Sequence, residues 1–299
     1  MTFNNFSQQY KPIIQDQLVN YVTFGYEDSR HVLEDALQYT VKAKSKCIRP
    51  LLSIATFTML APTKKIDGIL PLACALEFFH TYSLIHDDLP VMDDDDFRRG
   101  QPSCHKKYGE DIAVLAGDTL NTIAFEIMAK ELPQYFDPLK ITQSISHMSA
   151  ALGLTGMIGG QVMDIKGSSK NSDADYLKKT HSLKTGAVLK SCIELPAILL
   201  DTPEETYEHL SKFGGHLGLL FQIIDDILDS IGTTEELGKT ANKDEEQDKL
   251  TYTSLYGLED AQKMAKQEAE SAKYHLSQLQ DYDVSNLNSL IDYLITRTS

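Results

Sequence analysis

The sequence lacks the features that mark a secreted, membrane-embedded or nucleic-acid-binding protein. It has 28 basic against 43 acidic residues and a formal charge of −15, whereas binding to nucleic acid or to an anionic membrane requires basic surfaces. Residues 1–17 show no basic stretch followed by an apolar one, so no signal peptide is expected. The most apolar stretch, residues 68–85, carries Pro71, Glu77 and His80 and falls short of a transmembrane run. We therefore expect a cytoplasmic protein without stable membrane insertion and without a nucleic-acid partner.

Cysteine pairs, linkers and repeats are also missing. The four cysteines are widely spaced and form no Cys-x-x-Cys pair, which predicts free thiols in a reducing compartment and no zinc site. No linker rich in proline and serine divides the chain, and no short repeat is present. The sequence therefore predicts a single domain over residues 1–299.

What the sequence does have is apolar residues at helical spacing almost throughout. No convincing alternating strand and no Asn-Gly hairpin are found. A hydrophobic content of 42% allows a large buried core. We predict an all-α domain of about ten helices around a central apolar cavity, packed by the rules of helix bundles. The stretch 68–88 is apolar on nearly all sides, so we expect it to be a central helix.

Two clusters of aspartates interrupt this apolar pattern. Their members are Asp87, Asp88 and Asp93 in the first, and Asp225, Asp226 and Asp229 in the second. On a helix Asp225 and Asp229 would be about 40° apart, one turn above the other, with Gln222 a turn earlier. Carboxylates stacked in this way repel each other, which indicates a cation between them. Oxygen ligands alone favour a hard ion such as Mg²⁺, which commonly also binds substrate phosphates.

The first cluster is interrupted by a proline. Because Pro90 cannot continue a helix, we expect the helix to end near Asp88 and the chain to turn, so that Asp93 comes back toward Asp87. For the following Asp94–Asp96, two interpretations stay open: a solvated acidic loop or further metal ligands.

Basic residues beside glycine, proline or the acidic clusters are candidates for binding phosphate. Arginine offers two parallel donors to a phosphate, and lysine offers a mobile point charge. The adjacent arginines of the first cluster would suit two different phosphates. A histidine seven residues before Asp87, on the same helical face, is either a core residue or a ligand contact. The candidates are Lys46, Arg49, His80, Arg98, Arg99, Lys184, Lys239 and Lys249.

The chain resembles the trans-prenyltransferases, the short-chain isoprenyl diphosphate synthases, and within them the bacterial-type farnesyl diphosphate synthases (geranyltranstransferases). The resemblance extends from about residue 46 to 257, and its motifs follow one another in the order of the family. The matching segments are His86–Gly100, Leu115–Leu120, Gly159–Asp164, Lys184–Gly186, Phe221–Asp229 and Leu237–Lys239.

The resemblance implies a Mg²⁺-assisted ionisation, condensation and elimination that joins isopentenyl diphosphate to dimethylallyl or geranyl diphosphate. The aspartates of both clusters would hold Mg²⁺, three ions in all, with Asp87, Asp93 and Asp225 as ligands that bridge to the allylic diphosphate. Thr185 and Gln222 would line the region of the carbocation, and the family's usual homodimer is expected. The basic residues would divide into an allylic set of Arg98, Lys184, Lys239 and Lys249, and an isopentenyl set of Lys46, Arg49, His80 and Arg99.

The chain departs from the family's usual sequence at one motif and carries an aromatic residue that bears on product length. The chain has Ser45-Lys-Cys-Ile-Arg-Pro50 where the family usually has Gly-Lys-Arg-x-Arg-Pro, so Cys47 replaces an arginine. Tyr82, five residues and about 7.5 Å of helix before Asp87, resembles the farnesyl-length enzymes, although Ser83 is more nearly beneath Asp87. We favour a C15 product and leave C20 and C10 open. A metal phosphohydrolase, a silent partner subunit and a terpene cyclase are the rival interpretations.

Overall fold

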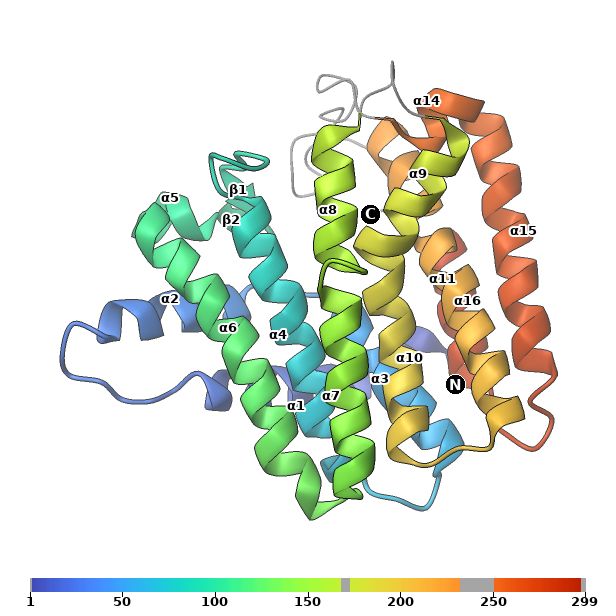
Figure 1. Cartoon of the computed structure of the whole chain (residues 1–299), viewed down its shortest axis with the longest axis horizontal. Helices are drawn as coiled ribbons and strands as arrows, with labels where there is room; N and C mark the ends of the chain where they lie inside the picture. The colour runs from blue at the N-terminus through green and yellow to red at the C-terminus, as the bar shows by residue number, and fades with distance from the viewer. Residues whose placement is uncertain (1, 168–172, 232–249, 297–299) are drawn as a thin grey trace. The chain divides into compact units, whose positions relative to one another are not determined.

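The computed structural model describes residues 2–167, 173–231 and 250–296 (Figure 1). The chain divides into two compact units. The first unit comprises residues 4–54 and 64–135, and the second comprises residues 1–3, 55–63 and 136–299. The single domain stays a prediction, whereas the all-α class is confirmed: among the described residues, eleven helices have ten residues or more.

The first unit is built almost entirely of helices, and the helix α3 contributes to both units. Its elements are α1 (Phe3–Tyr21), α2 (His31–Lys42), α3 (Ile48–Leu60), η1 (Ile66–Gly68), α4 (Leu70–Asp87), β1 (Phe97–Arg98), β2 (Gln101–Pro102), α5 (Cys104–Tyr108), α6 (Glu110–Glu131) and η2 (Leu132–Gln134).

Helix α4 is the buried centre of this unit and carries the first aspartates at its end. A proline lies in its first turn, where backbone N–H groups have no acceptor within the helix, so its missing N–H costs no hydrogen bond. Twelve of its residues are buried, and it packs most extensively against α6. The segment Glu110–Gln134, which contains α6, is long and apolar enough to cross a membrane by those two criteria alone. Its packing on α4 fits the alternative explanation, a core helix.

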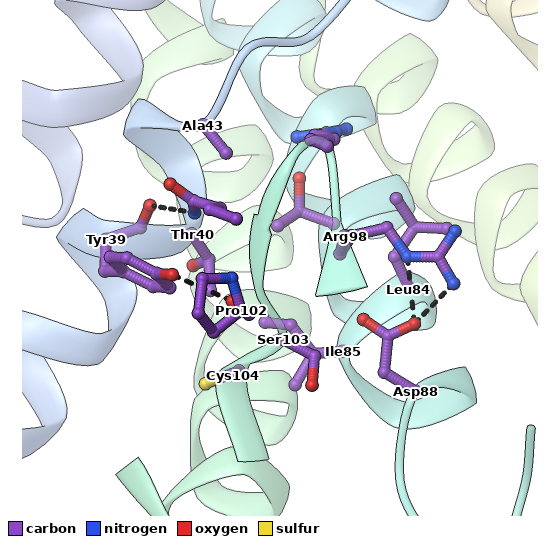
Figure 2. A pocket seen from close by; sticks show the side chains of 13 residues that line it. Tyr39, Thr40, Ala43, Leu84, Ile85, Asp88, Arg98, Pro102, Ser103 and Cys104 are labelled. Carbon is purple, nitrogen blue, oxygen red and sulfur yellow. Dashed lines mark hydrogen bonds and ion pairs between the residues drawn. The ribbon is translucent and has the colours of Figure 1, made fainter. Parts of the chain in front are cut away.

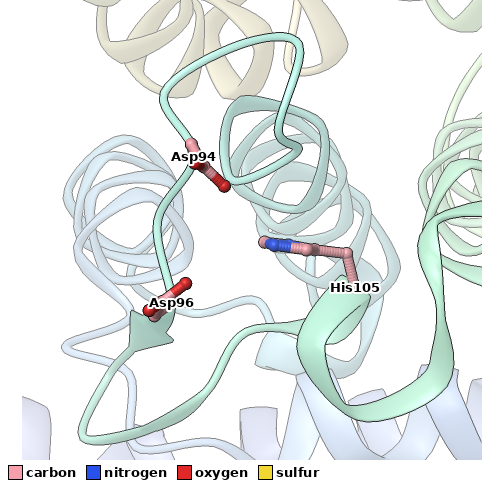
Figure 3. Close-up of side chains that lie close together, drawn as sticks. All are labelled: Asp94, Asp96 and His105. Carbon is pink, nitrogen blue, oxygen red and sulfur yellow. The ribbon is translucent and has the colours of Figure 1, made fainter.

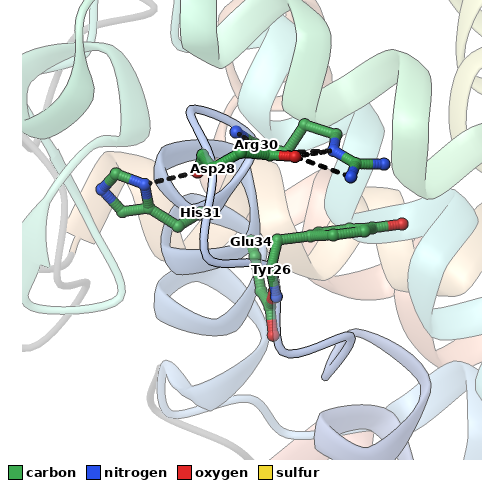
Figure 4. Close-up of polar contacts among 5 residues, drawn as sticks. All are labelled: Tyr26, Asp28, Arg30, His31 and Glu34. Atoms are coloured by element: carbon green, nitrogen blue, oxygen red, sulfur yellow. Dashed lines mark hydrogen bonds and ion pairs between the residues drawn. The ribbon is translucent and has the colours of Figure 1, made fainter.

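One carboxylate orders the loop between α1 and α2. Glu34, on α2, accepts hydrogen bonds from the backbone N–H groups of Phe24, Gly25 and Tyr26 at 2.8, 2.9 and 3.1 Å. Arg30 lies 3.9 Å above the Tyr26 ring and pairs with an aspartate of the same loop (Figure 4). Glu34 is 7% exposed, so this loop depends on a buried acid that is not part of the candidate site.

The two-residue strands β1 and β2 form a small hairpin that the sequence did not predict. Arg98 pairs with Gln101, which leaves Arg99 and Gly100 as the loop, with φ values of +56° and +78°. Positive φ at both loop residues defines a type I′ turn, normally signalled by Asn-Gly or Asp-Gly. Arginine in the first loop position gives no such signal, so the hairpin escaped the sequence analysis. The Tyr39 hydroxyl donates to the Pro102 carbonyl at 2.8 Å and ties the hairpin to α2 (Figure 2).

The second unit contains the longest helix, α11, with α10 and α15 packed against it. Helix α7 begins at a proline and is capped by Asp137, whose carboxylate accepts from Leu139 N–H at 2.8 Å. The elements are α7 (Pro138–Leu152), α8 (Met157–Lys166), α9 (Ala174–His181), η3 (Ser182–Gly186), α10 (Ala187–Leu199), α11 (Glu204–Ile231), α14 (Tyr252–Tyr256), α15 (Leu258–Ser277) and α16 (Ser285–Thr296).

Candidate active site

The first acidic motif folds back on itself at the end of α4. The helix ends at Asp87, and the backbone N–H of Asp93 donates to the Asp87 carbonyl at 2.8 Å. Asp95 N–H donates to the Asp88 carbonyl at 3.2 Å. The return of Asp93 to Asp87, expected from Pro90, is confirmed. The turn brings aspartates six residues apart in sequence to one end of one helix.

Arg98 is held by two acids of this motif (Figure 2). It forms a hydrogen-bonded ion pair with Asp88, and its Nη2 lies 2.9 Å from Asp95 Oδ2. Asp88 is 2% exposed, and burial raises the pKa of its carboxyl to about 6, against the opposing effect of Arg98. The pocket shown in Figure 2 lies against this pair and is lined by residues of α2, α4 and the hairpin. Asp88 therefore serves as an anchor for Arg98 in this structure.

The neighbouring Arg99 binds a different acid. Its Nη2 donates to Glu77 Oε1 at 3.3 Å, and the hydroxyl of Ser45 donates to the same oxygen at 2.6 Å. Glu77 is 3% exposed and was not a candidate in the sequence analysis. The two adjacent arginines are thus directed to separate carboxylates, in keeping with the expectation that they serve different phosphates.

His80 lies among the cations of the first unit. Burial, followed by the charges of Arg49, Arg99 and Arg98, lowers the pKa of its imidazole well below the usual range. A neutral imidazole donates one hydrogen bond and carries no charge. The charges of the three predicted phosphate-binding arginines thus act on one histidine, while Lys46, on the loop before α3, is exposed.

Asp94, Asp96 and His105 form another group of donors, with ligand atoms within 4.8 Å of one another (Figure 3). The His105 ring is directed into the space between the two carboxylates. Lys106 Nζ already lies 2.7 Å from Asp96 Oδ1, so a protein cation partly neutralises this group. For Asp94 and Asp96 the geometry favours a charge-balanced surface loop, whereas Asp95 is buried and pairs with Arg98.

The chain-length candidates lie along α4. Tyr82 is 8% exposed, its ring contacts that of His86 edge-on at 5.8 Å, and burial raises its pKa to about 12. The Ser83 hydroxyl donates to the His80 carbonyl at 2.9 Å, within its own helix. Phe78 and Phe79 are fully buried. The phenol is therefore a buried, uncharged aromatic one turn and a half before Asp87.

The second acidic motif lies near the end of α11, where Asp225 and Asp229 share a helical face as predicted. Gln222 Oε1 accepts from the Thr185 hydroxyl at 2.9 Å, and its Nε2 donates to Asp226 Oδ1 at 2.9 Å. The other Asp226 oxygen accepts from the Tyr252 backbone N–H at 2.8 Å. The carboxylate of Asp226 is thus held by protein donors and orients Gln222.

Lys184 and Thr185 project from η3, a π-helical turn between α9 and α10. Such turns are often found at functional sites. Lys184 Nζ lies 2.6 Å from Asp164 Oδ2, on α8. Two glycines allow the turn to be packed this closely: a Cβ on Gly160 would lie 2.2 Å from Lys184 N, and one on Gly218 would lie 2.8 Å from Gly186 Cα. Lys239 and Lys249, the remaining predicted contacts, lie outside the described residues.

An all-helical scaffold with two aspartate motifs, and with lysine and arginine side chains already oriented by acids, is typical of enzymes that transfer prenyl groups from diphosphates. The chain belongs to the polyprenyl synthetase family, whose profile matches residues 30–290. It is 42% identical over 268 residues to farnesyl diphosphate synthase of Escherichia coli, covering 88% of each chain. It is 41% identical over 268 residues to a chloroplastic geranylgeranyl pyrophosphate synthase of Capsicum annuum, covering 89% of this chain and 72% of the relative.

Solved structures agree with this assignment. A geranyltransferase from Helicobacter pylori, complexed with magnesium and isoprenyl diphosphate, superposes with a TM-score of 0.89 at 32% identity and covers 98% of this chain and 97% of its own. The chain is therefore a short-chain trans-prenyltransferase.

Glu77 and Asp164 were missed as site residues, and Asp95 was predicted only as a loop residue or a metal ligand. Each holds a basic residue that was predicted. The Gly-Gly-Gln-Val-Met-Asp segment contains Asp164 and was noted as a family motif, which was the available signal. No sequence signal marked Glu77, because a single glutamate in an apolar helix does not by itself indicate a functional site.

Proposed function

We propose that the chain condenses isopentenyl diphosphate first with dimethylallyl diphosphate and then with geranyl diphosphate to give farnesyl diphosphate. The observation that carries this proposal is that Arg99 is held by Glu77, one helical turn before His80, and not by an aspartate of the first motif. A cation held apart from the aspartates of the motif suits a diphosphate that binds without metal. A terpene cyclase or a phosphohydrolase has no use for such a second diphosphate site.

The carboxylates of the two motifs fit Mg²⁺, since they offer oxygen atoms only. Asp87, Asp93 and Asp225 are the proposed ligands that would hold Mg²⁺ for the allylic diphosphate, with Asp229 beside Asp225 on α11. The predicted ligands Asp88 and Asp226 already accept hydrogen bonds from protein groups, and we assign their carboxylates mainly to positioning. The full complement of three ions follows from the family resemblance. When bound, Mg²⁺ would neutralise the leaving diphosphate and so favour ionisation of its C–O bond.

The side chains of the chain supply the remaining electrostatics. Lys184, with Arg98, donates to the diphosphate as its charge develops, and one unit-charge pair 4 Å apart is worth about 4 kcal/mol at an effective dielectric constant of about 20. Thr185 and Gln222 present oxygen dipoles toward the allylic cation; their mutual hydrogen bond of 2.9 Å fixes that orientation. Lys239 and Lys249 would add to the allylic set.

Arg49 and Arg99, with Lys46, would hold isopentenyl diphosphate so that its alkene faces the cation. His80 contributes one N–H and no charge, since its pKa is lowered. The diphosphate released from the allylic substrate accepts the final proton. This accounts for a reaction that needs no side chain as nucleophile or general base.

A second candidate is the synthesis of geranylgeranyl diphosphate, because the Capsicum annuum relative is nearly as similar as the Escherichia coli one. Tyr82 favours the farnesyl product, because a buried aromatic five residues before Asp87 resembles the farnesyl-length enzymes. We also propose a homodimer in the cytoplasm, on the family resemblance.

Incubation with dimethylallyl and isopentenyl diphosphates and Mg²⁺, followed by chromatography of the products, tests the proposal. We expect a C15 diphosphate, and its loss by at least 100-fold in Asp87→Ala and Asp225→Ala. Release of phosphate without a longer prenyl product would refute the synthase, and full turnover by both variants would refute the metal roles.

A further inference from the structure

Glu77 lies beneath two backbone segments that carry the cations of the proposed isopentenyl site. It is on α4, one turn before His80, with a side chain that is 3% exposed. Its Oε1 accepts from Ser45 at 2.6 Å and from Arg99 at 3.3 Å. A buried carboxylate is costly unless it is paired and hydrogen-bonded, so both donors are required partners of this acid.

The first segment is the loop before α3. The Ser45 hydroxyl that donates to Glu77 also accepts from the Cys47 backbone N–H at 3.1 Å. Cys47 has a φ of +51°, a conformation that a non-glycine residue keeps only where its surroundings fix it. Lys46 lies between these two residues and Arg49 two residues later, so the hydrogen bonds of Ser45 set the backbone from which both cations project.

The second segment is the hairpin loop. Arg99 also has a left-handed backbone, with a φ of +56°, and occupies the first loop position of the type I′ turn. Its ion pair with Glu77 fixes the side chain on the face of α4 that carries His80, while Arg98 is turned toward Asp88. The Glu77 carboxylate therefore connects the loop that contains Cys47 with the hairpin loop that contains Arg99.

We propose that Glu77 is a positioning residue for the isopentenyl diphosphate half of the site, and that Ser45 is its link to the segment of Lys46 and Arg49. This inference rests on the proposed function. Ser45 stands where the family usually has glycine and Cys47 where it has arginine. Burial and the charge of Glu77 raise the pKa of the Cys47 thiol to about 12, so Cys47 brings no charge of its own. The Ser45–Glu77 bond supplies an anchor that a glycine at position 45 lacks.

Whether removing the charge of Glu77 weakens or tightens the binding of isopentenyl diphosphate distinguishes a positioning role from simple charge repulsion. A carboxylate near a diphosphate repels it, so removing only the charge of Glu77 would tighten binding. Loss of positioning would weaken it, because a hydrogen bond to a charged group is strong enough to change an equilibrium constant by about tenfold. Glu77→Gln keeps the shape of the side chain and removes the charge, so its effect on affinity has opposite signs under the two explanations.

The test is calorimetric binding of isopentenyl diphosphate to the full chain in EDTA, where metal-dependent binding is suppressed, together with steady-state kinetics in Mg²⁺. For Glu77→Gln we expect Kd and KM for isopentenyl diphosphate to rise about tenfold, and for Ser45→Ala about fivefold. KM for geranyl diphosphate should change by less than twofold. Glu34→Gln, a buried glutamate of the same unit that orders a loop outside the site, should leave both constants unchanged.

A double-variant cycle gives the decisive measurement. If Ser45 acts through Glu77, Ser45→Ala should have no further effect on Kd in a Glu77→Leu background, because leucine has no acceptor, whereas the amide oxygen of Glu77→Gln can still accept from Ser45. Unchanged or tighter binding by Glu77→Gln, equal rises in KM for both substrates, or fully additive effects would each overturn the positioning role. If the unaltered chain binds isopentenyl diphosphate and elongates geranyl diphosphate, such a result rejects this inference alone. If it does neither, the proposed function itself fails.

Discussion

Gly160→Ala tests whether the position of Lys184 depends on the close packing of α8 against the π-helical turn. Gly160 lies in the middle of α8, and the added Cβ would lie 2.2 Å from the backbone N and 2.6 Å from the Cα of Lys184. Both neighbours are main-chain atoms, so no flexible side chain can move aside. Either α8 or η3 must shift.

The size of the shift follows from these distances. Ordinary contact begins near 3.4 Å, so the gap must open by 3.4 − 2.2 = 1.2 Å. Overpacking of this kind costs about 1–3 kcal/mol, offset by about 1 kcal/mol from replacing a helical glycine with alanine. A misplacement of about 1 Å in a catalytic group costs about 100-fold in rate. We expect kcat to fall about 100-fold while the free energy of unfolding falls by no more than about 2 kcal/mol.

The assay is steady-state condensation of geranyl with isopentenyl diphosphate, with urea unfolding measured on the same samples. Gly215→Ala on α11 is the matched control, because nothing lies within 4 Å of its added Cβ; it should keep full activity and gain up to about 1 kcal/mol. A folded Gly160→Ala protein with an unchanged kcat would refute the argument that this contact positions Lys184.

Three other variants test separate parts of the structure. Tyr82→Ala should move the main product from C15 to C20 in a chromatographic assay; an unchanged product would exclude Tyr82 as the limit. Lys184→Met should lower kcat by 100- to 1000-fold with a smaller change in KM for isopentenyl diphosphate, and equal effects on both would contradict an allylic role. Burial, and then the charge of His216, lowers the pKa of His275 in the folded protein. Because this histidine takes up a proton more readily in the unfolded chain, the free energy of unfolding should fall as the pH drops below about 6.5. His275→Gln should flatten the pH dependence of the urea midpoint, and an unchanged slope would contradict this assignment.

Much of the fold could be predicted because helical periodicity is a local signal. The break at Pro90 gave the end of α4 and the return of Asp93 to Asp87, since a proline removes a donor and the chain must turn. The stacking of Asp225 and Asp229 follows from helix geometry alone. In both motifs the functional geometry is fixed within a few residues of sequence.

The partners of the basic residues could not be predicted, because they depend on contacts between elements. The family motif that ends at Asp164 marks this acid but does not show that it pairs with Lys184, twenty residues later, and nothing near Arg99 indicates Glu77. The Arg99-Gly100 turn was missed for the same reason: its left-handed arginine is stabilised by a distant ion pair, whereas turn signals in sequence are local.

These ion pairs explain how a chain with a formal charge of −15 can present cations to diphosphates. Asp88, Glu77 and Asp164 each hold a basic side chain in place, so part of the ordering cost of binding is met by folding. The same acids lower the net attraction for an anion, so affinity must come from oriented donors rather than from long-range charge. Binding of isopentenyl diphosphate should accordingly depend only weakly on ionic strength, since contacts shorter than the Debye length of about 8 Å in 0.15 M salt are little screened when partly buried. If the Kd for isopentenyl diphosphate in EDTA rose steeply with salt concentration, these cations would act mainly by long-range electrostatic attraction instead.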